Sequence, residues 1–586
     1  MDTLISLFHR AVEQNPDCPA VTDDACTLTY AELDRRSDSV ATALREHGFG
    51  SEDRVGVHVH RSTRLFVAIL GILKAGCAYV SVDTRYPGSR RDLMLRESGA
   101  EVVLTDADFT PALSVVVPTV MLVDEIDGHD GETAAAPARR SDPTPASAAS
   151  VLFTSGSSGT PKAIVLEHRN LVSFATNPSL PQLTRDDRVG QISSVSFDAF
   201  HFEMWSTIAA GAEIVVLPPV PDLLAADFQR QMRRYRISAM LVPTMVINHV
   251  VYEDRDAFAS LRLLQAGGDV ILPSACRDLL SGRFEGTFYN LYGPAEITTC
   301  CTAHLITAED AETDSIPIGL PLHGVTLHVL SPDLMPVARG KVGELFVGGS
   351  GVGRGYLGAP ELTAQRFLEI GGERLYRTGD LVQQREDGVY LFVGRTDDQI
   401  KVRGYRIEPG EVERGLRRHR GVQDAAVLPD SEGDDRRLVA FVVLENSLSL
   451  KDLRAHAQAE LPDYMVPSDI IVLTTIPASE HGKRDTGALR ELLGRHRERT
   501  NSYVAPSTDT ERYLGELWAE LLGVEKVGVQ EDFFALGGHS LQAFRVQRRI
   551  KRELGVRVDN STLLSNTVLG DLAKVIDALI DEALAR

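Results

Sequence analysis

A run of hydroxyl and glycine residues that ends on a lysine is the first feature of this sequence that could do chemistry. It reads Val151-Leu-Phe-Thr-Ser-Gly-Ser-Ser-Gly-Thr-Pro-Lys162 and begins as an apolar strand. Glycines let backbone N–H groups approach a polyphosphate, hydroxyl groups donate further hydrogen bonds, and Lys162 supplies charge. A polar turn after a strand is the plainer alternative. The candidate phosphate-binding residues are Thr154, Ser155, Gly156, Ser157, Ser158, Gly159, Thr160 and Lys162.

The same loop differs from two common nucleotide-binding loops. Lys162 follows Pro161 rather than a glycine, which excludes a Walker A loop. The pattern also departs from the strand-to-helix dinucleotide fingerprint.

A serine near the C-terminus is the second feature of this sequence that could do chemistry. Ser540 ends the string Asp532-Phe-Phe-Ala-Leu-Gly-Gly-His-Ser540, and we expect it to open a helix. The apolar positions of this expected helix include Leu541, Phe544, Ile550 and Leu554. A simple helix N-cap is one alternative. A hydrolase nucleophile elbow is another, but its G-x-S-x-G pattern fails at Gln542.

The composition indicates a soluble protein of several domains. The chain has 586 residues, 43% hydrophobic and 24% charged, where roughly 150 residues per domain are usual. Its longest apolar stretch, Leu65 to Leu73, is about half a membrane span. The first residues are expected to form an amphipathic helix capped by Asp2 rather than a signal peptide. We therefore expect a cytoplasmic protein.

The charge and the cysteines exclude some partners. The formal net charge is −21, from 61 basic and 82 acidic residues, so nucleic-acid phosphates are repelled and a phosphate-bearing ligand needs a local site. The six cysteines form no C-x-x-C pair, so we expect reduced thiols and no zinc site. Neither nucleic acid nor membrane is an expected partner.

Short β-branched runs alternate with helical patterns from Leu28 to about Ile476. Examples are the strand-like Val55–Val59 and Ala212–Leu217 and the helix-like Asp227–Tyr235. This alternation favours an α/β fold with largely buried sheets.

Changes in the sequence pattern divide the chain into several parts. One falls near Asp397, and another is the polar stretch before residue 510. We expect a large domain over residues 1–396, a small domain over 397–498, a linker over 499–509 and a helical bundle over 510–586. The bundle has one apolar helix face, made of Leu569, Leu572, Ile576, Leu579 and Ile580.

The phosphate loop resembles that of the adenylate-forming superfamily, which includes nonribosomal peptide synthetase adenylation domains, acyl-CoA ligases and luciferases. Further motifs follow in the family's order: LTYAELD at Leu28, LKAGCAYVSVD at Leu73, FDAFHFEMW at Phe197, NLYGPAE at Asn290, GELFVGG at Gly343, YRTGD at Tyr376, GRTDDQIKVRGYRIEPGEVE at Gly394, LPDYMVP at Leu461 and HGKRD at His481. The resemblance implies an α/β protein with a large N-terminal adenylation domain and a small mobile α+β lid domain.

The C-terminal DFFALGGHSL string resembles peptidyl carrier protein domains, whose serine carries 4′-phosphopantetheine. The resemblance implies that the helical bundle is a carrier domain and that Ser540 is its attachment site. Three positions depart from the family pattern of the adenylation domain: Ala163 replaces a glycine, Ala295 a threonine and Ser81 a proline. The hydroxyl lost at Ala295 would cost roughly 1 kcal/mol, so activity should survive.

The resemblance also implies roles for individual side chains. Tyr292 would stack on adenine, Asn290 would bond its edge, Asp380 would accept the ribose hydroxyls, Glu296 would hold Mg²⁺, Arg395 would bond ribose or phosphate, and Lys483 would bridge the substrate carboxylate and phosphate oxygens. Catalytic roles are likewise implied for Lys401, Gly404 and Asp397, with Asp397 as the hinge of the lid. Structural alternatives are a core tyrosine, a turn-capping aspartate and a solvated lysine.

Ten positions match the family's amino-acid pocket: Asp198, Ala199, Phe202, Met240, Leu264, Ala266, Leu291, Thr299, Cys300 and Lys483. A carboxylate at Asp198 fits an α-ammonium group, whereas helix capping is its structural alternative. The other side chains are largely apolar, so a charged substrate side chain should be rejected. We expect a branched aliphatic amino acid, with a phenylalanine-like substrate as the second choice.

These residues predict an ATP-dependent enzyme that makes an aminoacyl-AMP and loads it as a thioester on Ser540, for nonribosomal peptide or related biosynthesis. The implied cofactors are ATP, Mg²⁺ and 4′-phosphopantetheine. The implied partners are a phosphopantetheinyl transferase, a downstream condensation or tailoring enzyme in trans, and an MbtH-like helper as an open case. An acyl-CoA ligase-like enzyme and an inactive scaffold that presents the carrier are the rival hypotheses.

Overall fold

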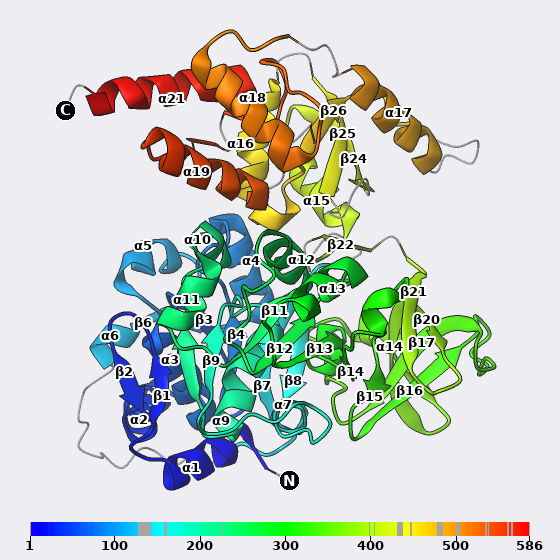
Figure 1. Cartoon of the computed structure of the whole chain (residues 1–586). Helices are drawn as coiled ribbons and strands as arrows, with labels where there is room; N and C mark the ends of the chain where they lie inside the picture. The colour runs from blue at the N-terminus through cyan, green and yellow to red at the C-terminus, as the bar shows by residue number, and fades with distance from the viewer. Residues whose placement is uncertain are drawn as a thin grey trace. The chain divides into compact units, whose positions relative to one another are not determined.

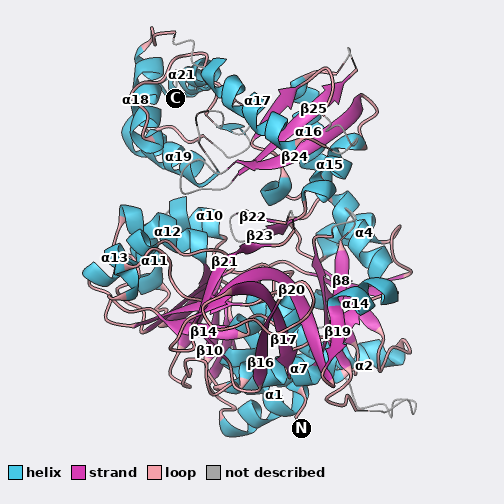
Figure 2. Cartoon of the chain, turned by 90° about the vertical axis from the view of Figure 1, so that its right-hand side faces the viewer, coloured by secondary structure: helices cyan, strands magenta, loops and turns pink. Residues whose placement is uncertain are grey.

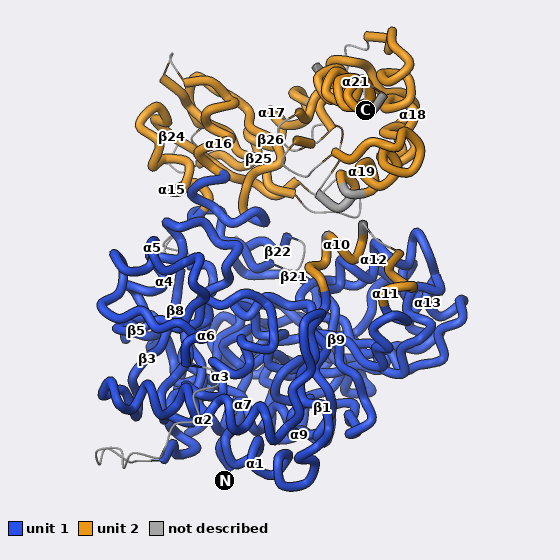
Figure 3. Tube along the Cα trace, turned by 90° about the vertical axis from the view of Figure 1, so that its left-hand side faces the viewer, with its two compact units in different colours: residues 1–217, 232–411, 458–464 blue, residues 218–231, 412–457, 465–586 orange. Residues whose placement is uncertain are grey.

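The computed structural model of this chain describes residues 2–126, 142–156, 161–225, 227–397, 399–402, 405–430, 437–445, 448–477, 484–499, 504–533, 536, 538, 540–558, 562–563 and 566–584. The chain divides into two compact units (Figure 3). Unit 1 comprises residues 1–217, 232–411 and 458–464, and unit 2 comprises residues 218–231, 412–457 and 465–586.

The largest sheet of unit 1 has nine strands, in the order β15-β14-β13-β12-β11-β9-β10-β1-β2 (Figure 1). They are β15 (Leu320–Pro321), β14 (Thr302–Leu305), β13 (Thr287–Tyr292), β12 (Leu263–Gly267), β11 (Ala239–Pro243), β9 (Arg188–Gln191), β10 (Glu213–Val216), β1 (Pro19–Thr22) and β2 (Thr27–Thr29). The central strands pair in parallel, and the edge strands β14, β15 and β2 are antiparallel. Parallel strands are buried on both faces, which explains their nearly continuous apolar runs.

A second, seven-stranded sheet of unit 1 carries the predicted phosphate loop. Its order is β18-β8-β7-β4-β3-β5-β6. The strands are β18 (Gly355–Tyr356), β8 (Lys162–Glu167), β7 (Ala148–Thr154), β4 (Ala78–Ser81), β3 (Arg54–His58), β5 (Val102–Thr105) and β6 (Thr119–Leu122). β7 is parallel to β4 and antiparallel to β8, so the chain reverses direction between β7 and β8.

A third, antiparallel sheet and a short hairpin complete the strands of unit 1 (Figure 2). The third sheet contains β16 (Val325–Leu330), β17 (Val342–Gly349), β20 (Glu373–Gln384), β19 (Phe367–Ile370) and β21 (Tyr390–Arg395). The hairpin pairs β22 (Ile400–Val402) with β23 (Tyr405–Ile407). The predicted α/β class is confirmed, and so are the predicted strands near Val55 and Ala212.

Helices connect the strands of unit 1. Those before residue 218 are α1 (Leu4–Gln14), α2 (Tyr30–Glu46), α3 (Thr63–Lys74), α4 (Gly88–Ser98), α5 (Thr110–Leu113), α6 (Val123–Ile126), α7 (His168–Ala175), α8 (Ala199–His201) and α9 (Thr207–Ala209). The later ones are α12 (Thr244–Glu253), α13 (Pro273–Ser281) and α14 (Pro360–Arg366). The apolar stretch Leu65–Leu73 lies within α3 and is buried. Among the described residues, no helix is long and apolar enough to cross a membrane.

The first helix corrects one detail predicted from the sequence. Thr3, not Asp2, is the N-cap of α1, because its side chain accepts a hydrogen bond from the backbone N–H of Ser6. The backbone N–H of Thr3 donates a hydrogen bond to the Ser6 side chain, which completes a capping box. Asp2 instead forms an ion pair with Arg10 at 3.0 Å.

Unit 2 contains a mixed sheet and most of the C-terminal helices. The sheet is formed by β24 (Val422–Asp430), β25 (Arg437–Leu444) and β26 (Asp469–Val472). The helices assigned wholly or mainly to this unit are α10 (Val220–Ala225), α11 (Phe228–Arg234), α15 (Pro409–Arg417), α16 (Leu450–Glu460), α17 (Thr486–Arg499), α18 (Asp509–Leu522), α19 (Ser540–Leu554) and α21 (Leu569–Leu584). α11 confirms the helix predicted at Asp227–Tyr235.

The C-terminal helices share a core of their own. Trp518 of α18 is fully buried and packs edge-on against Phe533, with ring centroids 4.8 Å apart. In α21, Leu569, Leu572 and Ile576 are fully buried, and Leu579 and Ile580 pack against the same core. The predicted apolar face of this helix is therefore confirmed.

Candidate active site

The predicted phosphate loop is a hairpin connection between β7 and β8. Thr154, the last residue of β7, pairs with Lys162, the first residue of β8. Ser155 and Gly156 follow β7, whereas the predicted residues Ser157, Ser158, Gly159 and Thr160 lie outside the described residues. A strand–loop–strand arrangement agrees with the exclusion of the dinucleotide fingerprint, which leads from a strand into a helix.

Two buried polar atoms lie at the base of this hairpin, and one of them, Lys162 Nζ, is 5.5 Å from the centroid of the Tyr356 ring. Thr154 Oγ1 and Lys162 Nζ are buried and, among the described residues, make no hydrogen bond. Burial lowers the pKa of Lys162, and the Arg406 charge lowers it further. Buried polar groups without partners are costly and rare. A lysine and a hydroxyl in this state fit an oxyanion such as a phosphate group.

Glu296 is the most buried acidic group of the predicted site. Its side chain is 0% exposed, and its Oε1 accepts a hydrogen bond from Tyr356 Oη at 2.8 Å. Arg406 of β23 approaches Oε2 at 3.1 Å. Burial alone would raise the pKa of Glu296, but the charges of Arg406 and Lys162 lower it to about 2. An ionised carboxylate fits the hard-oxygen preference of Mg²⁺, provided that Arg406 leaves it.

The β22–β23 hairpin also reaches the phosphate loop. Ser155 Oγ donates to the backbone carbonyl of Arg406 at 2.6 Å, and Arg406 Nε donates to Gln399 Oε1 at 2.7 Å. The arginine is thus held at both its backbone and its guanidinium group. Arg406 and Tyr356 were not predicted as site residues, although Arg406 lies within the GRTDDQIKVRGYRIEPGEVE motif.

The predicted nucleoside-binding residues lie on β13, β20 and β21, and Asp380 of β20 is paired in register with Arg395 of β21. Tyr292 Oη donates to one carboxylate oxygen of Asp380, and Arg395 pairs with the other. Asn290 Nδ2 donates to the carbonyl of Pro317 at 2.8 Å. All four residues lie in unit 1, and their roles toward adenine and ribose stay predictions. Asp380 would have to exchange its protein partners for the ribose hydroxyls.

The predicted hinge residue is paired with the same arginine. Arg395 Nε donates to Asp397 Oδ1 at 2.7 Å and Arg395 Nη2 donates to Oδ2 at 3.0 Å. Such a two-point arrangement fixes a guanidinium and a carboxylate in one plane. Asp397 and Asp380 therefore share Arg395, which connects the start of the predicted hinge to the predicted ribose site.

The predicted amino-acid wall is assembled from three neighbouring strands and a short helix. Met240, Leu264, Ala266 and Leu291 lie on β11, β12 and β13, where Met240 is opposite Leu264. All four are buried, as are Phe202 and Cys300. Ala199 packs against the core cluster that contains Phe202, Leu291 and Cys300. The structure thus places these apolar side chains on neighbouring elements, and their role as the wall of an amino-acid pocket stays a prediction.

Asp198 precedes α8 in this wall and is partly buried. It occupies the N-cap position of α8, as the structural alternative predicts, but its side chain makes no capping hydrogen bond to that helix. Burial raises the pKa of the Cys300 thiol, and the charge of Asp198 adds to the effect. Asp198 therefore acts electrostatically on the wall of the predicted pocket.

Four predicted residues of the lid and the carrier are described only in part or not at all. Gly404 and Lys483 lie outside the described residues, and only the backbone of Lys401 is described, in β22. Ser540 is the first residue of α19, as predicted, but its side chain is not described. The catalytic roles of these residues stay predictions.

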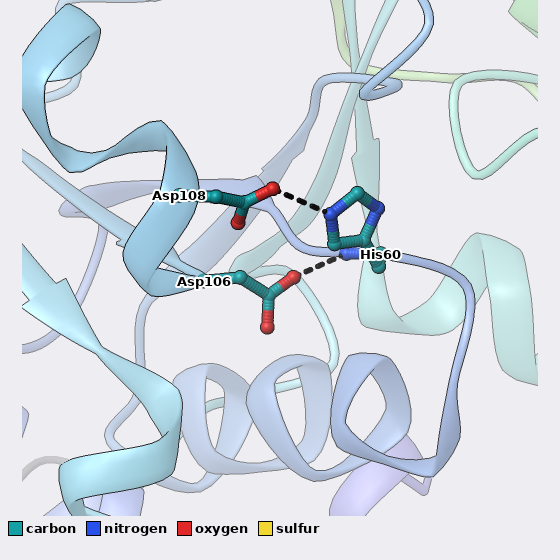
Figure 4. A group of neighbouring side chains, drawn as sticks. All are labelled: His60, Asp106 and Asp108. Atoms are coloured by element: carbon teal, nitrogen blue, oxygen red, sulfur yellow. Dashed lines mark hydrogen bonds and ion pairs between the residues drawn. The ribbon is translucent and has the colours of Figure 1, made fainter.

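A second group of polar side chains follows strands β3 and β5 (Figure 4). His60 Nε2 lies 3.0 Å from Asp108 Oδ2, and the backbone N–H of His60 donates to Asp106 Oδ2 at 2.6 Å. Arg64 lies 3.7 Å from Asp106 Oδ1. These contacts hold the loop after β3 against the turn after β5, and they explain the group as a local structural cluster.

Three family profiles match consecutive parts of the chain. The profile described as AMP-binding enzyme matches residues 8–357, and the AMP-binding enzyme C-terminal domain matches residues 411–483. The profile described as phosphopantetheine attachment site matches residues 512–576.

Curated relatives match nearly the whole chain. Gramicidin S synthase 2 of Aneurinibacillus migulanus is 36% identical over 585 residues, which cover 98% of this chain and 13% of the relative. Surfactin synthase subunit 3 of Bacillus subtilis (strain 168) is 33% identical over 557 residues, covering 94% and 43%. The chain therefore spans well under two thirds of the length of these relatives.

Solved structures resemble the chain as well. The structure of holo-PA1221, an NRPS protein containing adenylation and PCP domains and bound to a vinylsulfonamide inhibitor, has a TM-score of 0.83 and 27% identity, covering 100% of this chain and 98% of that one. The four-domain nonribosomal peptide synthetase holo-AB3403, bound to AMP and glycine, has a TM-score of 0.61 and 30% identity, covering 99% and 43%.

Proposed function

Because this chain belongs to the AMP-binding enzymes, as a nonribosomal peptide synthetase adenylation domain followed by a phosphopantetheine carrier domain, we propose that it activates an α-amino acid with ATP and loads it on its own carrier. The observation that carries the proposal is the presence of all three profiles in one chain. Lys162 and Thr154 support it, since their buried polar atoms make no hydrogen bond to the described residues and fit the phosphate groups of ATP.

The first half-reaction is attack of an amino-acid carboxylate oxygen on the α-phosphorus of ATP. The new bond joins that oxygen to phosphorus, and the bond to the bridging oxygen of the β-phosphate breaks, which releases pyrophosphate. Lys162 neutralises phosphate charge, and Lys483 is proposed to stabilise the charge that develops. When bound at Glu296, Mg²⁺ would add a further positive charge beside the phosphates. Arg406 must leave this carboxylate before a cation can bind it.

The second half-reaction transfers the aminoacyl group to the carrier. The thiolate of a phosphopantetheine arm on Ser540 attacks the carbonyl carbon of the aminoacyl-AMP, and the bond to the phosphate oxygen breaks, releasing AMP. A rotation at Asp397 is proposed to remove Lys483 and to bring Gly404 and Lys401 toward the path of the arm. The product thioester retains the acyl-transfer potential for a later step.

The proposed substrate is an apolar amino acid, and a branched aliphatic one such as valine or isoleucine is favoured. Asp198 would pair with the α-ammonium group. Met240, Leu264 and Leu291 are large, buried side chains that leave less room than a small-residue wall would. A phenylalanine-like substrate is the second choice, since Ala199 and Cys300 are small. Because the wall offers no charge apart from Asp198 and Lys483, charged substrate side chains should be rejected.

The carrier implies further proteins. A phosphopantetheinyl transferase must attach 4′-phosphopantetheine to Ser540. A condensation or tailoring enzyme must then take the amino acid from the thioester. An MbtH-like helper is a further proposed partner. An acyl-CoA ligase-like activity would instead transfer the acyl group to free coenzyme A, and an inactive scaffold would form no adenylate at all.

The deciding experiment is amino-acid-dependent ATP–pyrophosphate exchange across the proteinogenic amino acids and a set of aryl acids. Exchange with one apolar amino acid is expected. Loading of the holo chain with the same amino acid should then increase its mass by that of the aminoacyl group. Ser540→Ala is the matched control, because it should retain exchange and lose loading. Exchange with aryl acids only, or transfer to free coenzyme A instead of Ser540, would overturn the proposal.

A further inference from the structure

Two consecutive residues in the loop after β13 have an unusual backbone conformation. Thr298 and Thr299 have φ angles of 64° and 71°. Side chains branched at Cβ are real outliers in this region, so both residues are strained. The strained pair lies between Glu296, on the predicted phosphate side, and Cys300, in the predicted amino-acid wall.

Hydrogen bonds from both threonine side chains hold this conformation. Thr298 Oγ1 donates to the carbonyl of Gly351 at 2.8 Å, and Thr299 Oγ1 donates to the carbonyl of Asp198 at 3.0 Å. Gly293 allows the loop to close, because a Cβ there would lie 2.5 Å from Cys300 Cα. The loop therefore connects Tyr292, Glu296 and Cys300 through one tightly packed turn.

His201 is a buried histidine that contacts this turn. It is 1% exposed, and its Nδ1 lies 3.3 Å from Thr299 Oγ1. Burial lowers its pKa to about 3, so the ring is neutral at neutral pH. Since the Thr299 hydroxyl proton is directed to Asp198, Nδ1 is assigned as the N–H donor to the hydroxyl oxygen.

The carbonyl of Asp198 is thus fixed twice. It accepts the Thr299 hydroxyl at 3.0 Å and the backbone N–H of His201 at 2.9 Å. Both bonds depend on the short helix α8, where His201 is the last residue. Any shift of the imidazole would move Thr299 and the backbone that carries the Asp198 carboxylate.

We propose that His201 is a positioning residue for the amino-acid site, acting through Thr299 on Asp198 and on the strained Thr298–Thr299 turn. This inference rests on the proposed function and deepens it, since it assigns the alignment of the α-ammonium partner to a residue that touches no substrate. Neither His201 nor Thr298 was predicted from the sequence, where both resemble ordinary core positions.

A pair of substitutions tests the proposal in amino-acid-dependent pyrophosphate exchange. In His201→Asn the amide nitrogen replaces Nδ1, whereas in His201→Gln it falls near Nε2 and cannot reach Thr299 in the same way. His201→Asn should keep the KM for the amino acid within about threefold of wild type. His201→Gln should raise it about tenfold with the KM for ATP unchanged.

Equal KM values in the two variants, or equal changes in the KM for amino acid and for ATP, would overturn the positioning role. If either histidine variant fails to fold, Thr299→Val and Thr299→Ser replace the pair, because serine keeps the hydroxyl and valine does not. In this second pair, only the valine variant should raise the KM for the amino acid. An absence of exchange in the wild-type chain would instead contradict the proposed function itself.

Discussion

Asp198 carries the only charge identified in the predicted amino-acid wall among the described residues. Its charge acts on the thiol of Cys300, which burial keeps neutral. Removing this charge without changing the side-chain volume is therefore informative. Asp198→Asn should raise the KM for the amino acid about 10- to 100-fold, equivalent to about 1.4–2.8 kcal/mol, because an ammonium group would lose its ionic partner. The apparent affinity for ATP should stay within twofold.

Kinetics of pyrophosphate exchange measured against both substrates would check this prediction. Asp186→Asn is the matched control, since Asp186 is an exposed aspartate of the same unit. An unchanged KM for the amino acid in Asp198→Asn would show that another group receives the ammonium.

The second prediction at the scale of one residue concerns the contribution of Glu296 to stability. Its pKa of about 2 is below its ordinary value of 4.5, so its contribution to stability is present above about pH 4.5 and is lost as the pH falls toward 2. Glu296→Gln should destabilise unit 1 by roughly 3 kcal/mol, since it leaves the buried Arg406 without its carboxylate. The difference in Tm between wild type and variant should be constant from pH 5.5 to 8.

Thermal unfolding at several pH values would measure this difference. Glu312→Gln serves as the control, because Glu312 pairs with Arg277, both side chains are more than half exposed, and such pairs contribute little. A Tm difference that changes between pH 5.5 and 8 would mean that burial, not Arg406, governs the ionisation of Glu296.

At the scale of an element, the loop that leads into α19 depends on one glycine. A Cβ at Gly538 would lie 2.4 Å from the carbonyl oxygen of Phe533 and 2.5 Å from its ring. The backbone N–H of Gly538 also donates to that carbonyl at 2.8 Å, so the close approach is part of the fold. Gly538→Ala should therefore destabilise the carrier by about 1–3 kcal/mol and slow phosphopantetheine attachment at least tenfold.

Intact-mass measurement of phosphopantetheine attachment, together with pyrophosphate exchange, would test this. Exchange should be unaffected, since Gly538 lies in the carrier. Gly555→Ala is the control: its φ is 73° but no atom lies within 4 Å of the added Cβ, so the cost is limited to backbone strain of about 1–2 kcal/mol. Equal attachment rates in wild type and Gly538→Ala would contradict the packing argument.

The elements themselves follow largely from local patterns in the sequence. Strands β3 and β10, helix α11 and the apolar face of α21 were predicted because each has its own periodicity. The contact between Arg406 and Glu296 joins residues 110 positions apart, and no local pattern encodes it. The Thr298–Thr299 turn opposes local preference, because β-branched residues rarely adopt positive φ, and only long-range hydrogen bonds to Gly351 and Asp198 compensate.

At the scale of the whole molecule, the proposed function requires two half-reactions to share one chain. The AMP-binding profile ends at residue 357, its C-terminal partner begins at residue 411, and the carrier profile begins at residue 512. Asp397 lies between the first two, where Arg395 holds its carboxylate through two hydrogen bonds. A chain that alternates between adenylate formation and thioester formation needs a backbone position that can rotate, and Asp397 is the position we propose.

Asp397→Pro tests this requirement, because proline fixes φ near −65° and removes the backbone N–H. Pyrophosphate exchange should stay within about threefold of wild type, whereas the single-turnover rate of loading on holo Ser540 should fall at least tenfold. Asp397→Ala separates the two effects of the substitution, since it loses the carboxylate bound by Arg395 but keeps a rotatable backbone. If loading is slowed as much in Asp397→Ala as in Asp397→Pro, the carboxylate rather than the rotation is required. Equal loss of exchange and loading in Asp397→Pro would mean that no hinge operates at this residue, because a hinge is needed only for passage from the first half-reaction to the second.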